Sequence, residues 1–301
     1  MKAEATAIPA VSTVDKSWFS VFSDLIKARL TFLVLLTTLV GFYVGSREGM
    51  DYALMIHALL GTALVACGAS ALNQLWEREH DAKMRRTESR PLPSGRLQPE
   101  TVLVFGGMCA MAGLIYLAFA VNLLTSLLGA LTLTTYVFIY TPLKRITWLN
   151  TAIGAIPGAL PPLMGWTAAR NDISVEGWAL FAILFFWQIP HFLAIAWLYR
   201  EEYAKAGFVM LPAVDPAGER TGRQAVSHTM ALLFVSLLPV AFRISGAIYF
   251  CGALVCGLLF LWFAIQFSRS LSTRSARMLF FLSIIYLPVL LGLMVFDKIK
   301  Y

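Results

Sequence analysis

The chain has 301 residues, of which 58% are hydrophobic and only 14% are charged, and its mean hydropathy is +0.72. Soluble domains carry charge on about a quarter of their residues, so this composition excludes a soluble protein and indicates a helical membrane protein. The formal net charge of +7 requires no nucleic-acid partner, because basic loops against an anionic membrane surface account for it.

Apolar segments of about 20 residues, long enough to cross a bilayer as helices, recur along the chain. We expect nine, at residues 25–45, 52–76, 101–120, 123–141, 149–168, 177–198, 226–244, 246–267 and 277–296. The sequence therefore predicts an all-α, polytopic membrane protein. Its expected organisation is a cytoplasmic N-terminal tail at 1–24 and a single transmembrane domain at 25–301.

The fifth segment differs from the others because prolines and glycines interrupt it. Proline removes a backbone donor, so we expect this helix to be kinked or broken, while glycines let neighbouring helices approach closely. The residues are Pro157, Pro161, Pro162, Gly154, Gly158 and Gly165.

Most of the 24 Lys and Arg residues fall in alternate connections between these segments. Cytoplasmic loops carry such an excess of basic residues, so the bias predicts a cytoplasmic N-terminus. The same rule places the polar loops at 77–100, 141–147 and 199–225 together on the cytoplasmic face.

The first of these polar regions begins within the second apolar segment. Asn73, Glu77 and Asp81 recur every four residues, so on a helix they share one face. Amide and carboxylate oxygens can hold Mg²⁺, which often shares such ligands with substrate phosphate. A polar row is costly at the end of a membrane helix unless it has a function, and we expect Asp81 to lie in a wet, polar site there.

A basic cluster follows the row, at Lys83, Arg85, Arg86, Arg90 and Arg96. Guanidinium groups bind phosphate oxygens in a bidentate manner. Together the two features predict a metal–diphosphate site at the membrane surface. The alternative is an ordinary positively charged loop after a membrane helix.

Two further segments on the same face carry charge. Lys144 and Arg145 end the segment YTPLKR, where anchoring of the helix in the membrane is the alternative function. Glu202 and Lys205 lie in the segment YREEYAKAGFVMLP, for which a solvated turn is the alternative. The apolar residues that end this last segment could cover a site, as a lid does.

His191 lies near the middle of the sixth segment, within WQIPHF. An ionisable residue inside the membrane is a candidate for function, although a hydrogen-bonded structural histidine is the alternative.

These motifs give the chain a resemblance to the UbiA-type intramembrane prenyltransferases, and within them to the heme-farnesylating branch. The resemblance covers nearly the whole chain. Its most specific part is a long pattern that this sequence meets at Asn73, Glu77, Arg78, Asp81, Met84, Arg86, Thr87, Arg90, Pro91, Leu92 and Gly95. The segments YTPLKR, GAIPGALPPLMGW, WQIPHF and YREEYAKAGFVMLP agree with it.

The resemblance implies transfer of a farnesyl group from farnesyl diphosphate to a vinyl group of heme B, giving heme O for heme–copper oxidases. It implies a bacterial inner (plasma) membrane location, with heme A synthase or oxidase assembly factors as partners. Mg²⁺ would be held by Asn73, Glu77 and Asp81, with Glu202 as a further catalytic residue. The diphosphate would be bound by Arg78, Arg86, Arg90, Lys144, Arg145 and Lys205, and the heme by His191.

The second acidic motif departs from the pattern at two positions. Glu202 stands where the heme-farnesylating branch usually has Asp, and Ala206 stands where the wider superfamily often has a second Asp. Either the first motif holds one Mg²⁺ largely by itself, or Lys205 and the arginines replace part of the metal's charge. A related enzyme for a quinone or chlorophyll precursor is one alternative function. A secondary transporter is another, because broken helices and a midplane histidine occur in transporters.

Overall fold

The computed structural model describes residues 17–47 and 49–299, and this part of the chain contains helices but no strands. The long helices are α2 (Ala28–Gly45), α3 (Tyr52–Asp81), α4 (Pro99–Ala120), α5 (Leu123–Thr134), α7 (Asn150–Arg170), α8 (Val175–Leu198), α11 (Glu219–Val235), α13 (Ala247–Ser270) and α14 (Thr273–Phe296). The short ones are α1 (Trp18–Leu25), the π-helix η1 (Thr135–Tyr140), α6 (Thr141–Leu143), α9 (Arg200–Lys205), α10 (Leu211–Val214) and α12 (Leu238–Ala241).

Among the described residues, 8 helical segments are long and apolar enough to cross a membrane. They include the continuous runs Leu123–Leu143 and Glu219–Ala241, each built from adjoining helices. The remaining expected span is the helix α7, which is not among these 8 segments and carries three prolines in its interior. The predicted all-α membrane bundle is therefore confirmed, with α7 as a central helix that other helices shield from lipid.

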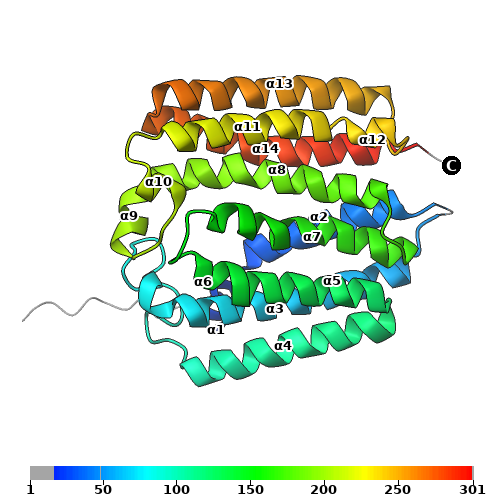
Figure 1. The fold of residues 1–301 in the computed structure, drawn as a ribbon. Coiled ribbons are helices and arrows are strands. Elements are labelled where there is room, and N and C mark those ends of the chain that lie inside the picture. The colour runs from blue at the N-terminus through cyan, green and yellow to red at the C-terminus, as the bar shows by residue number, and fades with distance from the viewer. Residues whose placement is uncertain (1–16, 48, 300–301) are drawn as a thin grey trace, which may run out of the picture.

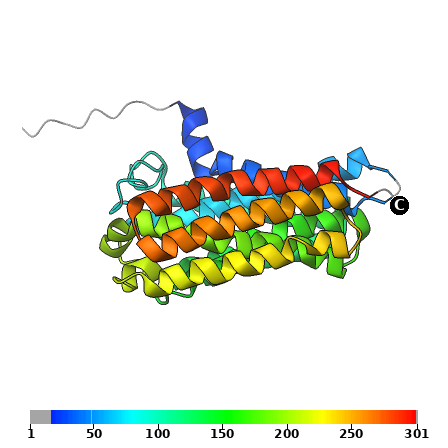
Figure 2. The same cartoon turned by 90° about the horizontal axis from the view of Figure 1, so that it is seen from above.

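The long helices run side by side along a common direction (Figure 1). One group contains α8, α11, α13 and α14, and the other contains α2, α3, α4, α5 and α7. The short α1 lies across this direction at one end of the bundle (Figure 2). Its Val21 and Leu25 are buried against Ala71 of α3 and Leu92 of the following loop, so α1 packs onto the domain instead of extending away from it.

The helix α7 continues through its prolines, so of the two expected outcomes, a kink or a break, the break does not occur. Tight packing on two sides gives the reason. A Cβ atom at Gly165 would meet the carbonyl oxygen of Thr38 in α2, and one at Gly158 would meet the side chain of Gln188 in α8. The glycines therefore bring α2 and α8 against α7, as expected, and these neighbours hold the helix together.

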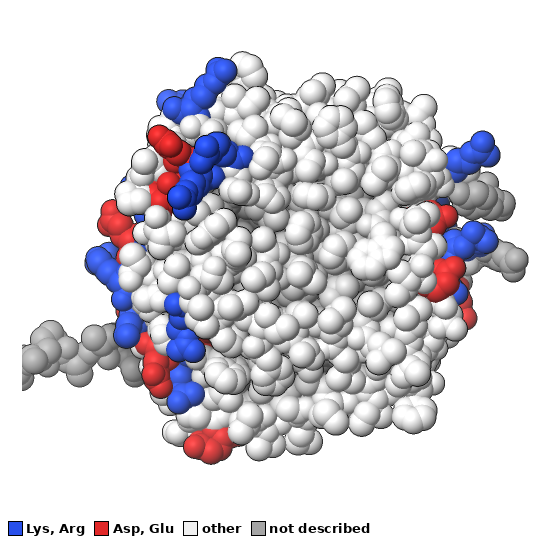
Figure 3. Space-filling view, in the orientation of Figure 1, with Lys and Arg blue, Asp and Glu red and all other residues white. Residues whose placement is uncertain are grey.

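Charged side chains gather at the two ends of the molecule and leave a wide uncharged band between them (Figure 3). Large apolar side chains such as Phe119, Met108 and Trp262 are exposed. Such exposure is costly in water and favourable in lipid, so the band is the part that lies in the membrane. The bundle thus has two polar ends.

Candidate functional site

The predicted row of Asn73, Glu77 and Asp81 lies on α3, at the end of the bundle that also holds α9 and α10. All three side chains are buried, with exposed fractions of 0%, 6% and 1%. The expectation of a wet site at Asp81 is therefore wrong for the protein alone. The helix continues to Asp81, and the loop after it folds back over the row.

Each member of the row binds a basic side chain from a different segment. Lys27, just before α2, donates from Nζ to Asn73 Oδ1 at 2.7 Å. Lys144 donates from Nζ to Glu77 Oε1 at 2.6 Å, and Arg90 donates from Nη1 to Asp81 Oδ2 at 2.6 Å.

These contacts are ion pairs at Glu77 and Asp81 and a charge-assisted hydrogen bond at Asn73. Three segments thus converge on one helical face, and two of them belong to the polar loops 77–100 and 141–147 that we expected to lie together.

Lys27 is a member of this site that sequence reasoning missed. A lysine just before an apolar segment is a common membrane anchor, and nothing in its spacing links it to α3. Its Nζ also lies 3.3 Å from the hydroxyl of Tyr136, in the π-helix η1. Burial, assisted by the positive charge of Arg90, lowers the pKa of Lys27 to about 7. Its charge is therefore sensitive to pH near neutrality.

The π-helix next to this lysine orients several side chains toward the row. Thr141 directly follows it and accepts a hydrogen bond from Asn73 Nδ2 at 2.9 Å. The ring of Tyr140 lies 4.5 Å from Lys144 Nζ. π-Helical turns inside membrane helices occur often at functional sites, because the extra residue redirects the side chains around it.

Lys144 connects the site to the loop at 199–225. Burial alone would lower the pKa of Lys144, but the carboxylate of Glu77 outweighs it and raises the pKa above its ordinary value. The carbonyl of Lys144 accepts a hydrogen bond from the Val209 amide at 2.7 Å, and Asn150 Nδ2 donates to the Val209 carbonyl at 2.8 Å. The lysine stays protonated, and its backbone holds the covering loop in place.

Residues 203–210 cover the site from the side of α9. Arg86 donates from Nη2 to the Tyr203 hydroxyl at 2.8 Å, and its guanidinium lies over the Tyr199 ring. Phe208 and Met210 are buried in a cluster with Met84 of the first loop. The apolar end of the segment is therefore packed over the row, where the sequence placed a lid.

Two carboxylate oxygens at this end are buried without a partner. They are Asp81 Oδ1 and Glu202 Oε2. A buried acceptor without a partner is costly, and a cation supplied with the substrate would satisfy it.

Within residues 17–47 and 49–299, no three His, Cys, Asp or Glu side chains form a metal-binding group. Mg²⁺ is commonly held by one or two carboxylates together with substrate phosphate, so this set of oxygens fits a Mg²⁺ ion that arrives with a diphosphate.

The remaining predicted residues lie farther from the row. Arg78 is exposed and contacts Glu79 and the Leu75 carbonyl. Arg145 and Lys205 are exposed, and among the described residues neither one is hydrogen-bonded to the row. His191 lies in α8 and contacts α14 instead, with Nδ1 at 2.7 Å from Ser283 Oγ. The structure thus brings Arg86, Arg90 and Lys144 to the site and leaves Arg78, Arg145 and Lys205 at its rim.

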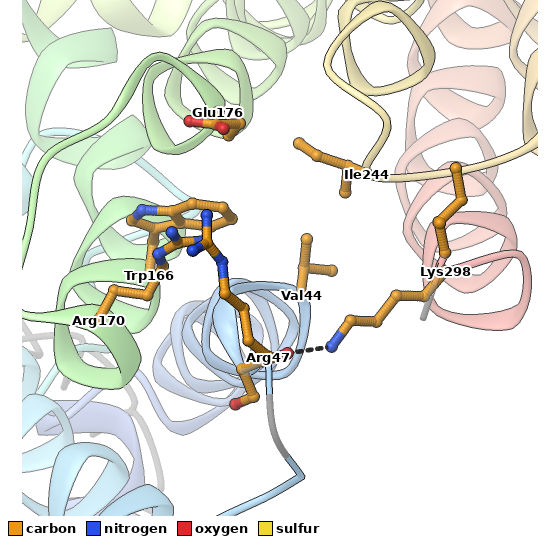
Figure 4. A pocket seen from close by; sticks show the side chains of 9 residues that line it. Val44, Arg47, Trp166, Arg170, Glu176, Ile244 and Lys298 are labelled. Carbon is orange, nitrogen blue, oxygen red and sulfur yellow. Dashed lines mark hydrogen bonds between the residues drawn. The ribbon is translucent and has the colours of Figure 1, made fainter. Parts of the chain in front are cut away.

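The opposite end of the bundle holds a small cavity of about 20 Å³, lined in part by Trp166, Arg170 and Lys298 (Figure 4). This is room for a single water molecule. Lys298 Nζ donates to the carbonyls of Tyr43 and Ser46, at 2.6 Å each. Arg170 lies 4.8 Å from the Trp166 ring. None of the predicted site residues lies here. Lys298 binds backbone carbonyls, and Arg170 contacts an aromatic ring and the half-exposed Asp172.

Comparison with known proteins places the chain in a family. The sequence model of the UbiA prenyltransferase family matches residues 34–285. The protoheme IX farnesyltransferase of Solibacter usitatus (strain Ellin6076) is 45% identical over 286 residues, which cover 92% of this chain and 98% of that protein. The protoheme IX farnesyltransferase of Myxococcus xanthus (strain DK1622) is 43% identical over 304 residues and covers 99% of each chain.

Solved structures agree at the level of the fold. A structure described as digeranylgeranylglyceryl phosphate synthase in membranes gives a TM-score of 0.79 at 17% identity, covering 93% of this chain and 98% of that one. A UbiA homolog from Archaeoglobus fulgidus, bound to DMAPP and Mg²⁺, gives 0.63 at 16% identity, covering 91% and 99%. Because the family model covers most of the sequence and the relatives align over nearly all of it, the chain belongs to the UbiA prenyltransferase family.

Proposed function

We propose that this protein transfers a farnesyl group from farnesyl diphosphate to a vinyl group of heme B, and so makes heme O. The relatives named protoheme IX farnesyltransferase, at 45% and 43% identity over nearly the whole chain, support this activity. The observation in the structure that supports it best is the buried row of Asn73, Glu77 and Asp81 with its three cations. Such an arrangement suits a substrate that carries both negative charge and a metal ion.

The charged end of the bundle is the proposed diphosphate site. Asn73, Glu77 and Asp81 would hold Mg²⁺, with Glu202 assisting, and the metal would stabilise negative charge on the leaving diphosphate. Once the oxygens of the row bind a metal, their former partners become free to bind phosphate oxygens: Lys27 leaves Asn73, Lys144 leaves Glu77 and Arg90 leaves Asp81. The chain thus supplies fixed positive charge where negative charge develops as the C–O bond breaks.

The covering loop has a role in excluding water. The farnesyl cation formed by loss of diphosphate reacts with water unless water is kept out of the site. Phe208 and Met210 are buried over the row and carry no polar group that could hold water. We assign the loop at 199–212 the role of a lid that opens for substrate and closes before the bond breaks.

Heme B is the proposed acceptor. Its vinyl group attacks the farnesyl cation, water adds to the porphyrin-stabilised cation that results, and a proton leaves. His191 lies eight residues before Tyr199 on α8, so it sits about 12 Å deeper than the diphosphate end. A porphyrin can extend over this depth, with its propionates toward the basic end and its iron at His191.

The proposed cellular setting follows from charge. The excess of Lys and Arg at the diphosphate end supports a cytoplasmic position for this end. The bacterial inner membrane is the proposed location of the protein. Heme A synthase and oxidase assembly factors are the proposed recipients of the product.

Analysis of pigments by mass tests this function. The wild-type chain, expressed in a host that lacks heme O, should yield farnesylated heme. Glu77→Gln and Asp81→Asn should yield none, or very little. Glu79→Gln is the matched control, since this carboxylate lies on the same helix but is exposed and paired only with Arg78. Absence of farnesylated heme from well-expressed wild-type protein would refute the proposal.

A further inference from the structure

The surroundings of His191 define a second polar site, which lies between α8 and α14. The indole of Trp187 stacks on the imidazole, with ring centroids 5.0 Å apart and planes 23° apart. The ring of Phe280 lies 5.1 Å away on α14. Trp187 Nε1 also donates to the carbonyl of Ser283 at 2.8 Å. Two aromatic rings and one serine therefore fix the position of the imidazole.

The hydrogen bonds of Ser283 decide which nitrogen of His191 carries the proton. The serine hydroxyl donates to the carbonyl of Phe280 at 2.6 Å, and a carbonyl oxygen can only accept. The hydroxyl has one hydrogen, so in its contact with His191 Nδ1 at 2.7 Å the serine oxygen accepts. The imidazole therefore donates from Nδ1.

The other nitrogen, Nε2, is the one that can act as a ligand. In a neutral imidazole with its proton on Nδ1, Nε2 keeps its lone pair. Nε2 has no hydrogen-bond partner among residues 17–47 and 49–299. It is also not a fully buried atom. Nε2 therefore keeps some accessible surface and has its lone pair unused by the described residues.

We propose that Ser283 is a positioning residue: it holds His191 in the tautomer whose Nε2 is open to the iron of a heme. This inference rests on the proposed function. Histidines that bind metals nearly always donate their other N–H to an oxygen, which fixes the ring and makes the ligand nitrogen more basic. Ser283 supplies that oxygen from α14, and Trp187 and Phe280 keep the ring from rotating. A histidine used only for packing would have no need of an open Nε2.

The test uses the purified full-length protein in detergent, with heme B added. Ser283→Ala removes the acceptor of the Nδ1 hydrogen, so heme should bind roughly 10- to 100-fold more weakly and its absorption bands should shift. The affinity for farnesyl diphosphate should not change, because that substrate is bound by α3 and the loops. Ser283→Thr keeps the hydroxyl and should restore the wild-type spectrum.

Ser236→Ala is the matched control. Its hydroxyl is also buried, with one backbone partner and the Tyr286 hydroxyl as the other, but it contacts no imidazole. It should leave the heme spectrum unchanged.

The outcomes separate this inference from the proposed function. A wild-type heme spectrum and affinity in folded Ser283→Ala, with both altered in His191→Ala, would overturn the role of Ser283 and leave the function intact. Unaltered heme binding in folded His191→Ala would overturn the ligand role and this inference together. Failure of the wild type to make farnesylated heme would refute the function, whatever the serine variant shows.

Discussion

At the end of the bundle that holds α9 and α10, three cations bind side chains of one helix. At the opposite end, Lys298 binds backbone carbonyls and Arg170 lies on an aromatic ring. Arg170 also forms an ion pair there, at 3.7 Å, with the half-exposed Asp172. In contrast, the carboxylates of Glu77 and Asp81 are buried and paired at 2.6 Å.

The partners of the cations distinguish a functional polar end from a structural one. A cation that binds a carbonyl completes a helix end and has no reason to exchange its partner. A buried carboxylate that still has an unpartnered oxygen, as Asp81 does, gains from a further cation. Both ends carry charged residues, so charge alone does not identify the functional end. The buried carboxylate partners of Lys144 and Arg90 do identify it.

The largest effect should come from the pair between Arg90 and Asp81. Asp81→Asn removes a proposed metal ligand and the partner of Arg90, so turnover should fall by at least roughly 100-fold. Mg²⁺-dependent release of diphosphate from farnesyl diphosphate measures it. Asp172→Asn, at the opposite end, should keep wild-type turnover. Near-normal activity of Asp81→Asn would contradict the assignment of the first motif.

The lysines at the two ends should differ in their contribution to stability. Lys144→Met leaves the buried Glu77 carboxylate without its cation, which should cost about 3–5 kcal/mol. Lys298→Met loses hydrogen bonds to two carbonyls, which should cost about 1–3 kcal/mol. Thermal unfolding of both variants in one detergent compares them, and farnesyl transfer should be lost only in Lys144→Met. Equal destabilisation by the two variants would show that the carboxylate partner makes no difference.

The stability of the protein should depend on pH through Lys27, at the end that holds the row. An unfolded lysine holds its proton up to a pH of about 10.4, whereas folded Lys27 holds it only up to about 7. Between these values the unfolded state binds more protons, so this lysine destabilises the fold less as pH rises. Lys27→Met should therefore raise the melting temperature over wild type most at pH 6 and least at pH 9. A gain independent of pH would contradict the lowered pKa of Lys27.

Labelling of introduced cysteines tests which end of the bundle faces the cytoplasm. The cysteine substitutions themselves should leave activity unchanged. In a variant whose native cysteines are replaced, cysteines at Ser94 and Ala217 report on the charged end, and one at Asn171 reports on the opposite end. All three positions are exposed. An impermeant reagent added to intact cells should label only the cysteine at Asn171. Labelling at Ser94 or Ala217 instead would reverse the proposed orientation.

Much of the fold follows from the sequence because lipid imposes a simple pattern. Apolar runs of about 20 residues can only be spanning helices, and the regular spacing of Asn73, Glu77 and Asp81 places them on one face. Breaks at proline were harder to predict, since α7 stays intact where its glycines let neighbouring helices support it. The short α1 was missed because its packing depends on α3 and on the loop that follows α3.

The site could be predicted only where its residues share a helix or a recognisable segment. Lys27 completes the row from another helix, and no spacing in the sequence connects it to Asn73. Burial of Asp81 also depends on how the following loop folds back, with Thr87 Oγ1 donating to the Asp81 carbonyl at 2.8 Å. The partner of a charge is a tertiary property, and a sequence pattern shows only the charge.

A single reaction can show whether the buried row and Mg²⁺ are needed for farnesyl transfer to heme. Purified wild-type protein is given farnesyl diphosphate and heme B, and released diphosphate and the mass of the heme are measured in the same reaction. We expect one diphosphate released for each heme that gains a farnesyl group and one water, only when Mg²⁺ is present, and neither product from Asp81→Asn. Release of diphosphate with the heme unchanged in mass, or equal product from Asp81→Asn, would contradict the proposal that the buried charged row drives farnesyl transfer to heme.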